Sequence, residues 1–321
     1  MKFHTRKPTA LAALLLTATF AFAGCGSDDG GNGGSADGGS SDGGGDLSIT
    51  MLPKNLGNAY FDTSTDGAER AAGELDAEFE EVGPDTASPD AQVQYINTVA
   101  QQGKSALILS ANDPDALCDA IDEARSADVK VVTFDADTNP DCRDLFINQA
   151  TAEGIATKQL ELIAEQIGGK GEIAILSASA NATNQNAWIA TMEEELAANP
   201  DYADIELVDT VYGDDEDQKS FDQTEALLQN HPDLKGIISP TTVGIAAAAR
   251  YLSDSEYKGK VALTGLGTPN QMREFVEDGT VGSFALWNPG DLGEFEVGAD
   301  GVVLLGEPFT FTEDNIGDFD F

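Results

Sequence analysis

The chain has 321 residues, long enough for two domains, and its 57 acidic and 17 basic side chains give a net charge of −40. A charge of this sign and size repels nucleic acid and anionic membrane surfaces, so we expect neither as a partner. Three cysteines and two histidines leave few ligands for a transition-metal centre.

The first 24 residues are arranged like a secretory signal peptide. A basic start precedes an apolar run at residues 9–23, which is too short to remain as a membrane-spanning helix. The run ends in FAGC, which resembles the lipobox of bacterial lipoproteins, and by that resemblance Cys25 carries the lipid. An ordinary signal peptide followed by an incidental cysteine is the alternative.

Residues 25–46 are expected to form a flexible tether. The stretch from Gly26 to Asp46 contains 10 Gly, 5 Asp and 4 Ser and no apolar side chain larger than alanine, so it cannot collapse into a core. Its root-mean-square reach is about 25 Å. We therefore expect the folded part on the extracytoplasmic face of the cell membrane, held there by its lipid anchor alone.

From Leu47 onward, short apolar runs alternate with longer helical patterns. The first half contains expected strands at 48–52, 78–82, 106–110, 129–134 and 145–148, and expected helices at 90–102 and 115–127. The second half contains expected strands at 172–177, 205–211, 236–239, 260–264 and 281–287, and expected helices at 151–167, 185–198, 220–230, 243–253 and 270–277. This alternation predicts an α/β fold of two doubly wound parallel-sheet lobes joined by a hinge, at 47–148 and 149–287.

Polar and aromatic residues gather directly after the expected strands, where ligands bind to sheets of this kind. The clusters are PKNLGNAYFD after the first strand, FDADTNPDC after the fourth, SASANATNQNAW after the sixth, SPTTVG after the eighth and LWNP at the tenth. Amides, hydroxyls, one cation and one carboxylate beside aromatic faces suit a small polyhydroxylated molecule. Any single cluster is better explained by helix capping, but their recurrence at the same strand ends favours a sugar site.

Other chemistries fit these residues less well. The DADTN stretch that begins at Asp135 opens like a calcium loop, but Pro140 stands where such a loop needs glycine. The acidic run GDDEDQ from Gly213 is more typical of a helix entrance than of a metal site. His231 has no serine or cysteine motif beside it, so an enzyme is not expected, and neither is a metal or other cofactor.

The remaining cysteines, Cys118 and Cys142, predict one disulfide in an exported chain. A metal pair is the alternative, but no further cysteine and only His231 follow the signal. Cys118 lies at the start of the helix after the third strand and Cys142 lies in the loop after the fourth. Since these strands should be neighbours, the two sulfur atoms are expected to meet.

Several long strings resemble the rhamnose-binding proteins of ABC importers, which have the type I periplasmic-binding-protein fold. They are PKNLGNAYFD, ILSANDPDAL, ILSASANATNQNAWI, TVYGDD, PTTVGIAAA, TGLGTPNQM and FALWNPGDLG. The resemblance runs from about Leu47 to Gly293 and resumes at PFTFTEDNIGDF. The related autoinducer-2-binding proteins look similar as well, with a lysine after the first strand and cysteines placed like Cys118 and Cys142.

The autoinducer-2 relatives imply part of a ligand site. Their lysine, their carboxylate after the fourth strand, their glutamine and their proline match Lys54, Asp135, Gln185 and Pro240. Two positions depart, because Asn184 stands for their aspartate and Thr242 for their small alanine. Both departures follow the rhamnose-binding pattern, so the resemblance favours a deoxyhexose such as rhamnose, with autoinducer-2 second.

Residues and resemblance together give an expected sugar site between the lobes. The first lobe should contribute the donors Lys54 and Asn55, the aromatic faces of Tyr60 and Phe61, and the acceptor Asp135. The second lobe should contribute Asn184, Gln185 and the turn Pro240, Thr241 and Thr242, with Trp287 near the hinge.

The resemblance also bears on topology and partners. Relatives continue after WNPGDLG with a helix that covers the sheet of the first lobe, whereas this chain runs directly into EFEVGADGVVLLGEPF. We therefore expect one helix to be missing near the C-terminus. Parts of 288–306 and 307–321 should complete the first and second lobes respectively. The expected partners are a small sugar and an ABC transporter permease, with the protein a monomer. A receptor for a membrane kinase would share every one of these residues.

Overall fold

The computed structural model describes residues 47–291 and 302–321, which fall within one compact unit beginning at Gly44. The expected signal peptide, Cys25 and the tether lie outside the described residues, as does the stretch after Asp291 where a helix was expected to be missing. None of the described helices combines the length and apolar character needed to cross a membrane.

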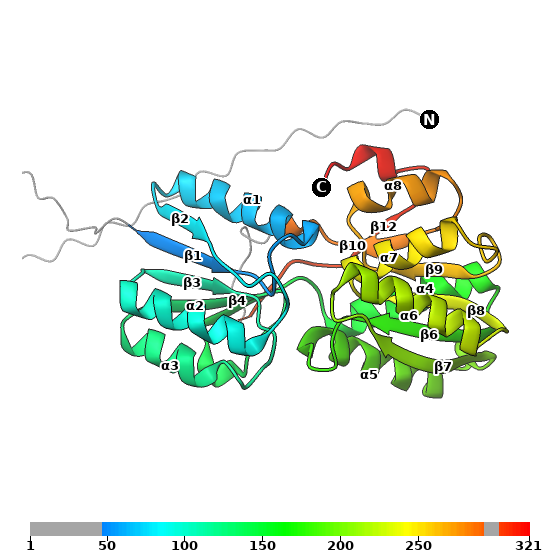
Figure 1. The fold of residues 1–321 in the computed structure, drawn as a ribbon, viewed down its shortest axis with the longest axis horizontal. Helices are drawn as coiled ribbons and strands as arrows, with labels where there is room; N and C mark the ends of the chain where they lie inside the picture. Colours follow the sequence, from blue (N-terminus) through cyan, green and yellow to red (C-terminus); the bar gives the residue numbers. More distant parts are fainter. Residues whose placement is uncertain (1–46, 292–301) are drawn as a thin grey trace, which may run out of the picture. The chain divides into compact units, whose positions relative to one another are not determined.

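The first sheet contains six parallel strands in the order β11-β5-β4-β3-β1-β2 (Figure 1). These strands are β1 (Ser48–Leu52), β2 (Glu78–Glu81), β3 (Ala106–Leu109), β4 (Lys130–Phe134), β5 (Leu145–Asn148) and β11 (Val302–Leu304). The last of them comes from the C-terminal part of the chain, so the polypeptide returns to this sheet after building the second one.

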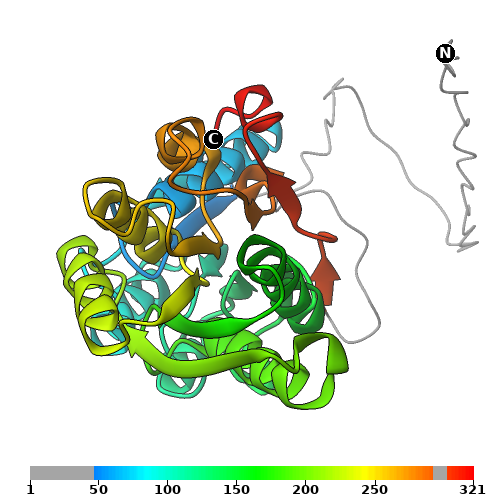
Figure 2. The ribbon, with the colours of Figure 1, turned by 90° about the vertical axis from the view of Figure 1, so that its right-hand side faces the viewer.

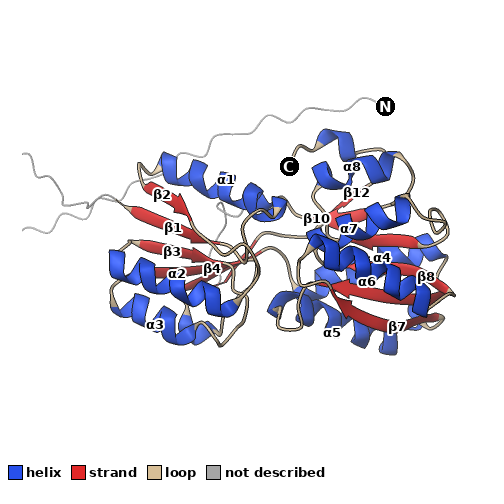
Figure 3. Ribbon diagram, viewed as in Figure 1, coloured by secondary structure: helices blue, strands red, loops and turns tan. Residues whose placement is uncertain are grey.

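Three helices cover the first sheet, on two faces (Figure 3). α2 (Pro89–Gln102) and α3 (Cys118–Ser126) pack beside each other on one face, and α1 (Ala59–Glu74) lies on the other. Successive side chains of a strand point to opposite faces. Leu52 accordingly joins the buried cluster of α2 and α3, whereas its neighbour Met51 joins the cluster that contains Tyr60 of α1. We call this sheet with α1–α3 the first lobe.

The second sheet contains four parallel strands in the order β7-β6-β8-β9. These are β6 (Gly171–Ser177), β7 (Ile205–Tyr212), β8 (Leu234–Ser239) and β9 (Ala262–Gly265). A short antiparallel pair, β10 (Phe284–Leu286) with β12 (Phe309–Phe311), extends it through a bridge between Leu266 and Ala285.

Helices lie on both faces of the second sheet (Figure 2). One packed pair is α4 (Ala152–Ile167) with α5 (Thr183–Ala198), and the other is α6 (Asp217–Asn230) with α7 (Thr242–Ser253). α8 (Pro269–Glu277) packs against α7. We call this sheet with α4–α8, β10 and β12 the second lobe. The chain passes between the lobes after β5, after β10 and between β11 and β12.

The predicted α/β class with parallel sheets and helices on both sides is confirmed. α1, however, was not among the expected helices. It begins within the PKNLGNAYFD stretch, where the Asn58 side chain caps it by accepting from the Tyr60 amide at 3.1 Å. Gly67 is needed there for packing, because a Cβ at that position would lie 2.4 Å from the carbonyl oxygen of Gly290.

Candidate functional site

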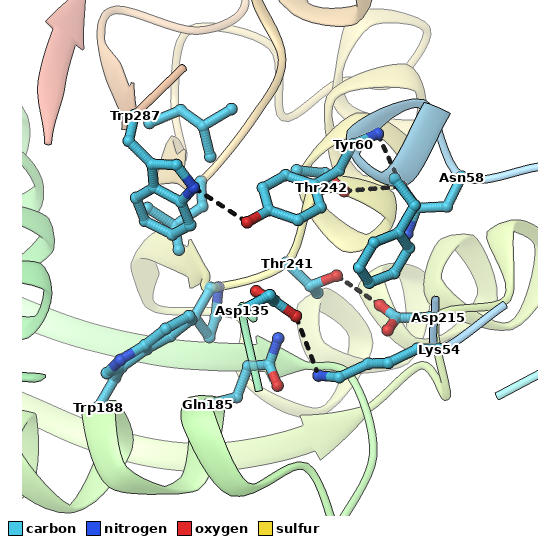
Figure 4. A pocket seen from close by; sticks show the side chains of 14 residues that line it. Lys54, Asn58, Tyr60, Asp135, Gln185, Trp188, Asp215, Thr241, Thr242 and Trp287 are labelled. Carbon is cyan, nitrogen blue, oxygen red and sulfur yellow. Dashed lines mark hydrogen bonds and ion pairs between the residues drawn. The ribbon is translucent and has the colours of Figure 1, made fainter. Parts of the chain in front are cut away.

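A cavity lies between the lobes, at the carboxyl ends of strands from both sheets (Figure 4). This is the position at which open parallel sheets bind ligands. The residues that line it are Lys54, Asn58, Tyr60, Phe61, Asp135, Gln185, Trp188, Asp215, Pro240, Thr241, Thr242, Leu266, Leu286 and Trp287.

A chain of three polar side chains connects the lobes inside this region. The Lys54 ammonium lies 3.7 Å from a carboxylate oxygen of Asp135, and both side chains are more than nine-tenths buried. Lys54 also donates to the side-chain oxygen of Asn184 at 3.1 Å, and the Asn184 amide donates to the other oxygen of Asp135 at 3.2 Å. Asn184 lies in the first turn of α5, so the ion pair of the first lobe is bonded directly to the second lobe.

Asp135 is held in place by its backbone as well as by its partners. It directly follows β4 and has φ +58, a left-handed conformation that costs energy for residues other than glycine. The Ser110 hydroxyl, beyond the end of the neighbouring strand β3, donates to it at 2.8 Å. Strained backbone of this kind is frequent in ligand sites, where the surrounding structure holds a side chain in one direction.

Aromatic side chains form one wall of the cavity. The rings of Tyr60 and Trp287 meet edge to face at 6.0 Å, and the Trp287 indole donates to the Tyr60 hydroxyl at 2.9 Å. Trp188 contacts Trp287 edge to face at 6.2 Å. Burial, followed by the charge of Asp135, raises the pKa of the Tyr60 phenol well above its usual range, so this hydroxyl stays protonated.

The second lobe contributes amide and hydroxyl groups. The side-chain oxygen of Gln185 is buried and has no hydrogen-bond partner within the described part of the chain. Thr242, at the start of α7, donates to the Asn58 side chain across the cavity at 3.3 Å, and the Thr241 hydroxyl donates to Asp215. A buried acceptor without a partner is costly, so the Gln185 oxygen is suited to receive a hydrogen bond from a ligand.

Little free space remains in the cavity. The cavity has a volume of about 30 Å³, which is space for one or two water molecules. Side chains from the two lobes bond to each other beside it, above all Lys54 to Asn184. A ligand therefore has to replace the contacts between the lobes with its own, which favours a small molecule rich in hydrogen-bonding groups.

Nine of the eleven residues predicted to bind a ligand line this cavity, and the other two do not. Asn184 does not line the cavity but bonds to both Lys54 and Asp135. Asn55 turns away: its amide donates to the Leu56 carbonyl at 3.4 Å, so the structure does not place it to donate into the cavity.

The prediction missed five lining residues: Asn58, Trp188, Asp215, Leu266 and Leu286. Asn58 and Trp188 belong to the clusters PKNLGNAYFD and SASANATNQNAW, so the sequence pattern could have identified them. Asp215 belongs to the GDDEDQ run that was interpreted as a helix entrance. That interpretation holds for Asp217, the first residue of α6, but not for Asp215 two residues earlier. Leu266 and Leu286 carry no polar signal at all.

The remaining predicted features can be placed as well. Cys118 and Cys142 form a disulfide with a Cα–Cα distance of 5.4 Å, which joins α3 to the loop after β4. In the stretch that resembles a calcium loop, Asp137 pairs with Arg143 at 2.9 Å and receives the Thr133 hydroxyl. Residues 47–291 and 302–321 contain no group of three or more His, Cys, Asp or Glu arranged to hold a metal ion.

Comparison with known proteins agrees with this geometry. The periplasmic binding protein domain matches residues 49–297, more than half of the chain, and the chain therefore belongs to that family. Proteins of this family bind solutes and are not enzymes.

Three solved structures are similar over most of the chain. A sugar ABC transporter protein from Actinomyces odontolyticus is 50% identical, with 86% of this chain and 98% of that one covered and a TM-score of 0.67. A solute-binding protein from Clostridium phytofermentas with bound L-rhamnose is 33% identical, with coverages of 85% and 98% and a TM-score of 0.81. LsrB from Clostridium saccharobutylicum in complex with AI-2 is 24% identical, with coverages of 86% and 100% and a TM-score of 0.80, and shares the fold.

Proposed function

We propose that this protein is the extracytoplasmic, lipid-anchored sugar-binding component of an ABC importer, and that it binds a deoxyhexose such as rhamnose between its lobes. The observation that carries the proposal is the buried Lys54–Asp135 pair, which faces an unpartnered Gln185 oxygen across a cavity with aromatic walls. The sugar-transporter and rhamnose-bound relatives, at 50% and 33% identity, support the choice of ligand class.

The proposed contacts follow the chemistry of the walls. Lys54 donates to sugar hydroxyls, while Asp135 and Gln185 accept from them. Tyr60, Phe61 and Trp287 cover the C–H face of the ring. The turn Pro240–Thr242 closes the opposite side. Leu266 and Leu286 make one part of the lining apolar, as the methyl group of a deoxyhexose requires.

The lobes are proposed to close on the ligand by a hinge motion. The proposed lobes are residues 47–148 with part of 288–306, and residues 149–287 with part of 307–321. The pairing of β11 with β5, and of β12 with β10, supports this division. A ligand that contacts both lobes stabilises the closed state by its differential affinity for that state. In this proposal the closed monomer is then recognised by the permease.

The same site fits autoinducer-2 as a second candidate. Lys54, Asp135, Gln185 and Pro240 match the residues that such receptors use, and all four line the cavity. Asn184 and Thr242 depart from that set. The two candidates differ chemically, because rhamnose has a six-membered ring with a methyl group whereas autoinducer-2 is smaller.

A thermal-shift and calorimetry screen of the protein without its signal tests the function. The ligands are L-rhamnose, L-fucose, D-ribose, D-arabinose and autoinducer-2. A ligand that binds only the folded state raises the melting temperature, and we expect L-rhamnose or a close deoxyhexose to give the largest rise. If autoinducer-2 gives the largest rise, the second candidate is correct. If no sugar changes the melting temperature, the proposal is wrong.

The anchor is tested separately by Cys25→Ser. We expect this variant to leave the membrane fraction or to stall before processing, because the lipid attaches to that sulfur. Unchanged retention in the membrane fraction would contradict the anchor without affecting the sugar site.

A further inference from the structure

Asp215 is the second carboxylate that lines the cavity, and it comes from the opposite lobe to Asp135. It lies in the connection between β7 and α6 and has φ +53, next to Asp214 with φ +55. The chain thus holds two successive residues in the left-handed conformation. Asp135 and Asp215 share this feature: each directs a carboxylate into the cavity from strained backbone after a strand end (Figure 4).

The Asp215 carboxylate can accept further hydrogen bonds. One carboxylate oxygen, Oδ1, receives the Thr241 hydroxyl. The other, Oδ2, receives no hydrogen bond from the residues that the structure describes. The charges of Lys54 and Asp135 both act on Asp215, so Lys54 lies under the influence of a carboxylate from each lobe. An ionised carboxylate has about four acceptor positions, so the side chain is far from saturated.

We propose that Asp215 contacts the ligand directly, accepting from a sugar hydroxyl on the second-lobe side while Asp135 accepts on the first-lobe side. This inference rests on the proposed sugar-binding function and deepens it. With two carboxylates and a single lysine, the site selects neutral, polyhydroxylated ligands. A sugar acid would add a third negative charge to it, and the like charges reject such a ligand.

The shifted pKa of Asp215 makes it possible to distinguish a residue that contacts the ligand from one that stabilises the fold. Burial raises its pKa, the Lys54 charge and the Thr241 hydroxyl lower it, and the nearby carboxylates of Asp135 and Asp214 raise it again, for a net increase. A carboxyl with a raised folded-state pKa disfavours folding once the pH exceeds its unfolded pKa, because the folded state then holds a costly charge. Without ligand, Asp215→Asn should therefore leave the melting temperature at pH 7 unchanged or raise it.

The test compares Asp215→Asn with Asp214→Asn. Both positions have a positive φ that asparagine tolerates, but Asp214 does not line the cavity and instead pairs with Lys219 on the surface. We expect Asp215→Asn to weaken binding of the best sugar about 10- to 100-fold, as the loss of a hydrogen bond to a charged group does. Asp214→Asn should bind within about twofold of wild type.

Calorimetry of sugar binding and the melting temperatures without ligand together test whether Asp215 contacts the ligand. Weaker binding by Asp215→Asn with an unchanged or raised melting temperature supports the contact. Binding as tight as in wild type overturns it, and so does weaker binding accompanied by a lower melting temperature, which is the pattern of a structural residue. If the Asn variant does not fold, Asp215→Gly, which suits the same φ, takes its place. Failure of the wild type to bind any sugar would instead refute the proposed function.

Discussion

The two lobes are built from the same kind of sheet but differ in how completely they bury it. In the second lobe, residues 173–177 of β6 are fully buried, because helix pairs cover both faces. In the first lobe, the apolar strand β3 alternates between partly exposed and buried residues. Leu107 and Leu109 face α2 and α3, while Ile108 points to the side covered by α1.

The partly covered face of the first sheet is an apolar groove beside α1. Its floor is formed by strand residues, among them Ile49, Met51, Ile108 and Ile147, and Leu75, directly after α1, is 63% exposed at its edge. Parallel strands that read as continuous apolar runs are normally buried on both faces. The strands of the first lobe therefore have the composition of strands buried on both faces, whereas among the described residues α1 covers one of the two faces only in part. The comparison shows that the apolar composition of a strand does not by itself tell whether both of its faces are buried in the folded protein.

The largest expected effect is on the unfolding free energy, when the same type of side-chain truncation is made in each of the two sheets. Ile175→Ala, in the closed core of β6, should cost about 2–5 kcal/mol of unfolding free energy, because it leaves a cavity. Ile108→Ala should cost less than half as much, since water reaches that face and no closed cavity forms. Leu109→Ala, on the covered face of β3, is the internal control and should resemble Ile175→Ala. Urea denaturation measures all three, and equal losses at positions 108 and 175 would remove the contrast.

The next effect concerns the disulfide, which the first lobe has and the second lacks. Replacing Cys118 and Cys142 by alanine should lower stability by about 3 kcal/mol, since the closed loop has a sequence separation of 24 residues. Faster amide exchange should appear in α3 while α6 keeps its protection. Equal loss of protection in both helices would mean that the bond stabilises the whole molecule and not its first lobe.

Ligand affinity tests whether the lobes contribute equally to the site. Asp135→Ala removes a first-lobe acceptor and Gln185→Ala a second-lobe acceptor, and each should weaken sugar binding. We expect about 1.5–3 kcal/mol for the charged Asp135 and about 0.5–1.5 kcal/mol for the neutral Gln185. Asp217→Ala is the control, because that side chain pairs with Arg250 outside the cavity. Calorimetry in which Asp135→Ala binds as tightly as wild type would contradict the proposed contact.

The smallest effect compares one surface ion pair from each lobe at low pH. The hydrogen bond from Lys104 lowers the pKa of Glu80 in the first lobe. In the second, burial raises the pKa of Asp278, but the hydrogen bonds from Lys258 and Thr280 together with the charge of Lys258 lower it by more, so the pKa is lowered on balance. A lowered carboxyl pKa stabilises the fold above the unfolded pKa, and this contribution is lost as the pH falls through the folded pKa.

Because both pairs are partly exposed, Glu80→Gln and Asp278→Asn should each remove only about 0.2–1 kcal/mol at neutral pH. Each variant should also lose stability less steeply on acidification than wild type does. Melting curves between pH 7 and pH 3 measure this. If both variants lose stability between pH 7 and pH 3 as steeply as wild type does, neither ion pair contributes to the pH dependence of stability.

Local patterns in the sequence were enough to predict the class of fold, the strand ends that build the site and the cysteine pair. These features follow from local patterns: apolar runs of strand length, amphipathic stretches between them, and polar residues just after each strand. Lys54, Asp135 and Gln185 could be selected in this way because the carboxyl ends of parallel strands meet at the same edge.

Which members of those clusters reach the cavity depends on tertiary contacts and could not be predicted from the sequence. Asn55 donates to the carbonyl of the neighbouring Leu56, whereas Asp215, one acid in a run of several, points inward because its left-handed backbone and Thr241 direct it there. Leu286 joins the site because β10 runs beside the end of β9. The partly covered face of the first sheet follows from no local pattern either, since the cover on a strand comes from distant segments; only the resemblance, which implied a missing helix over that sheet, pointed to it. Side-chain direction and burial depend on contacts between residues far apart in the chain, which no local pattern contains.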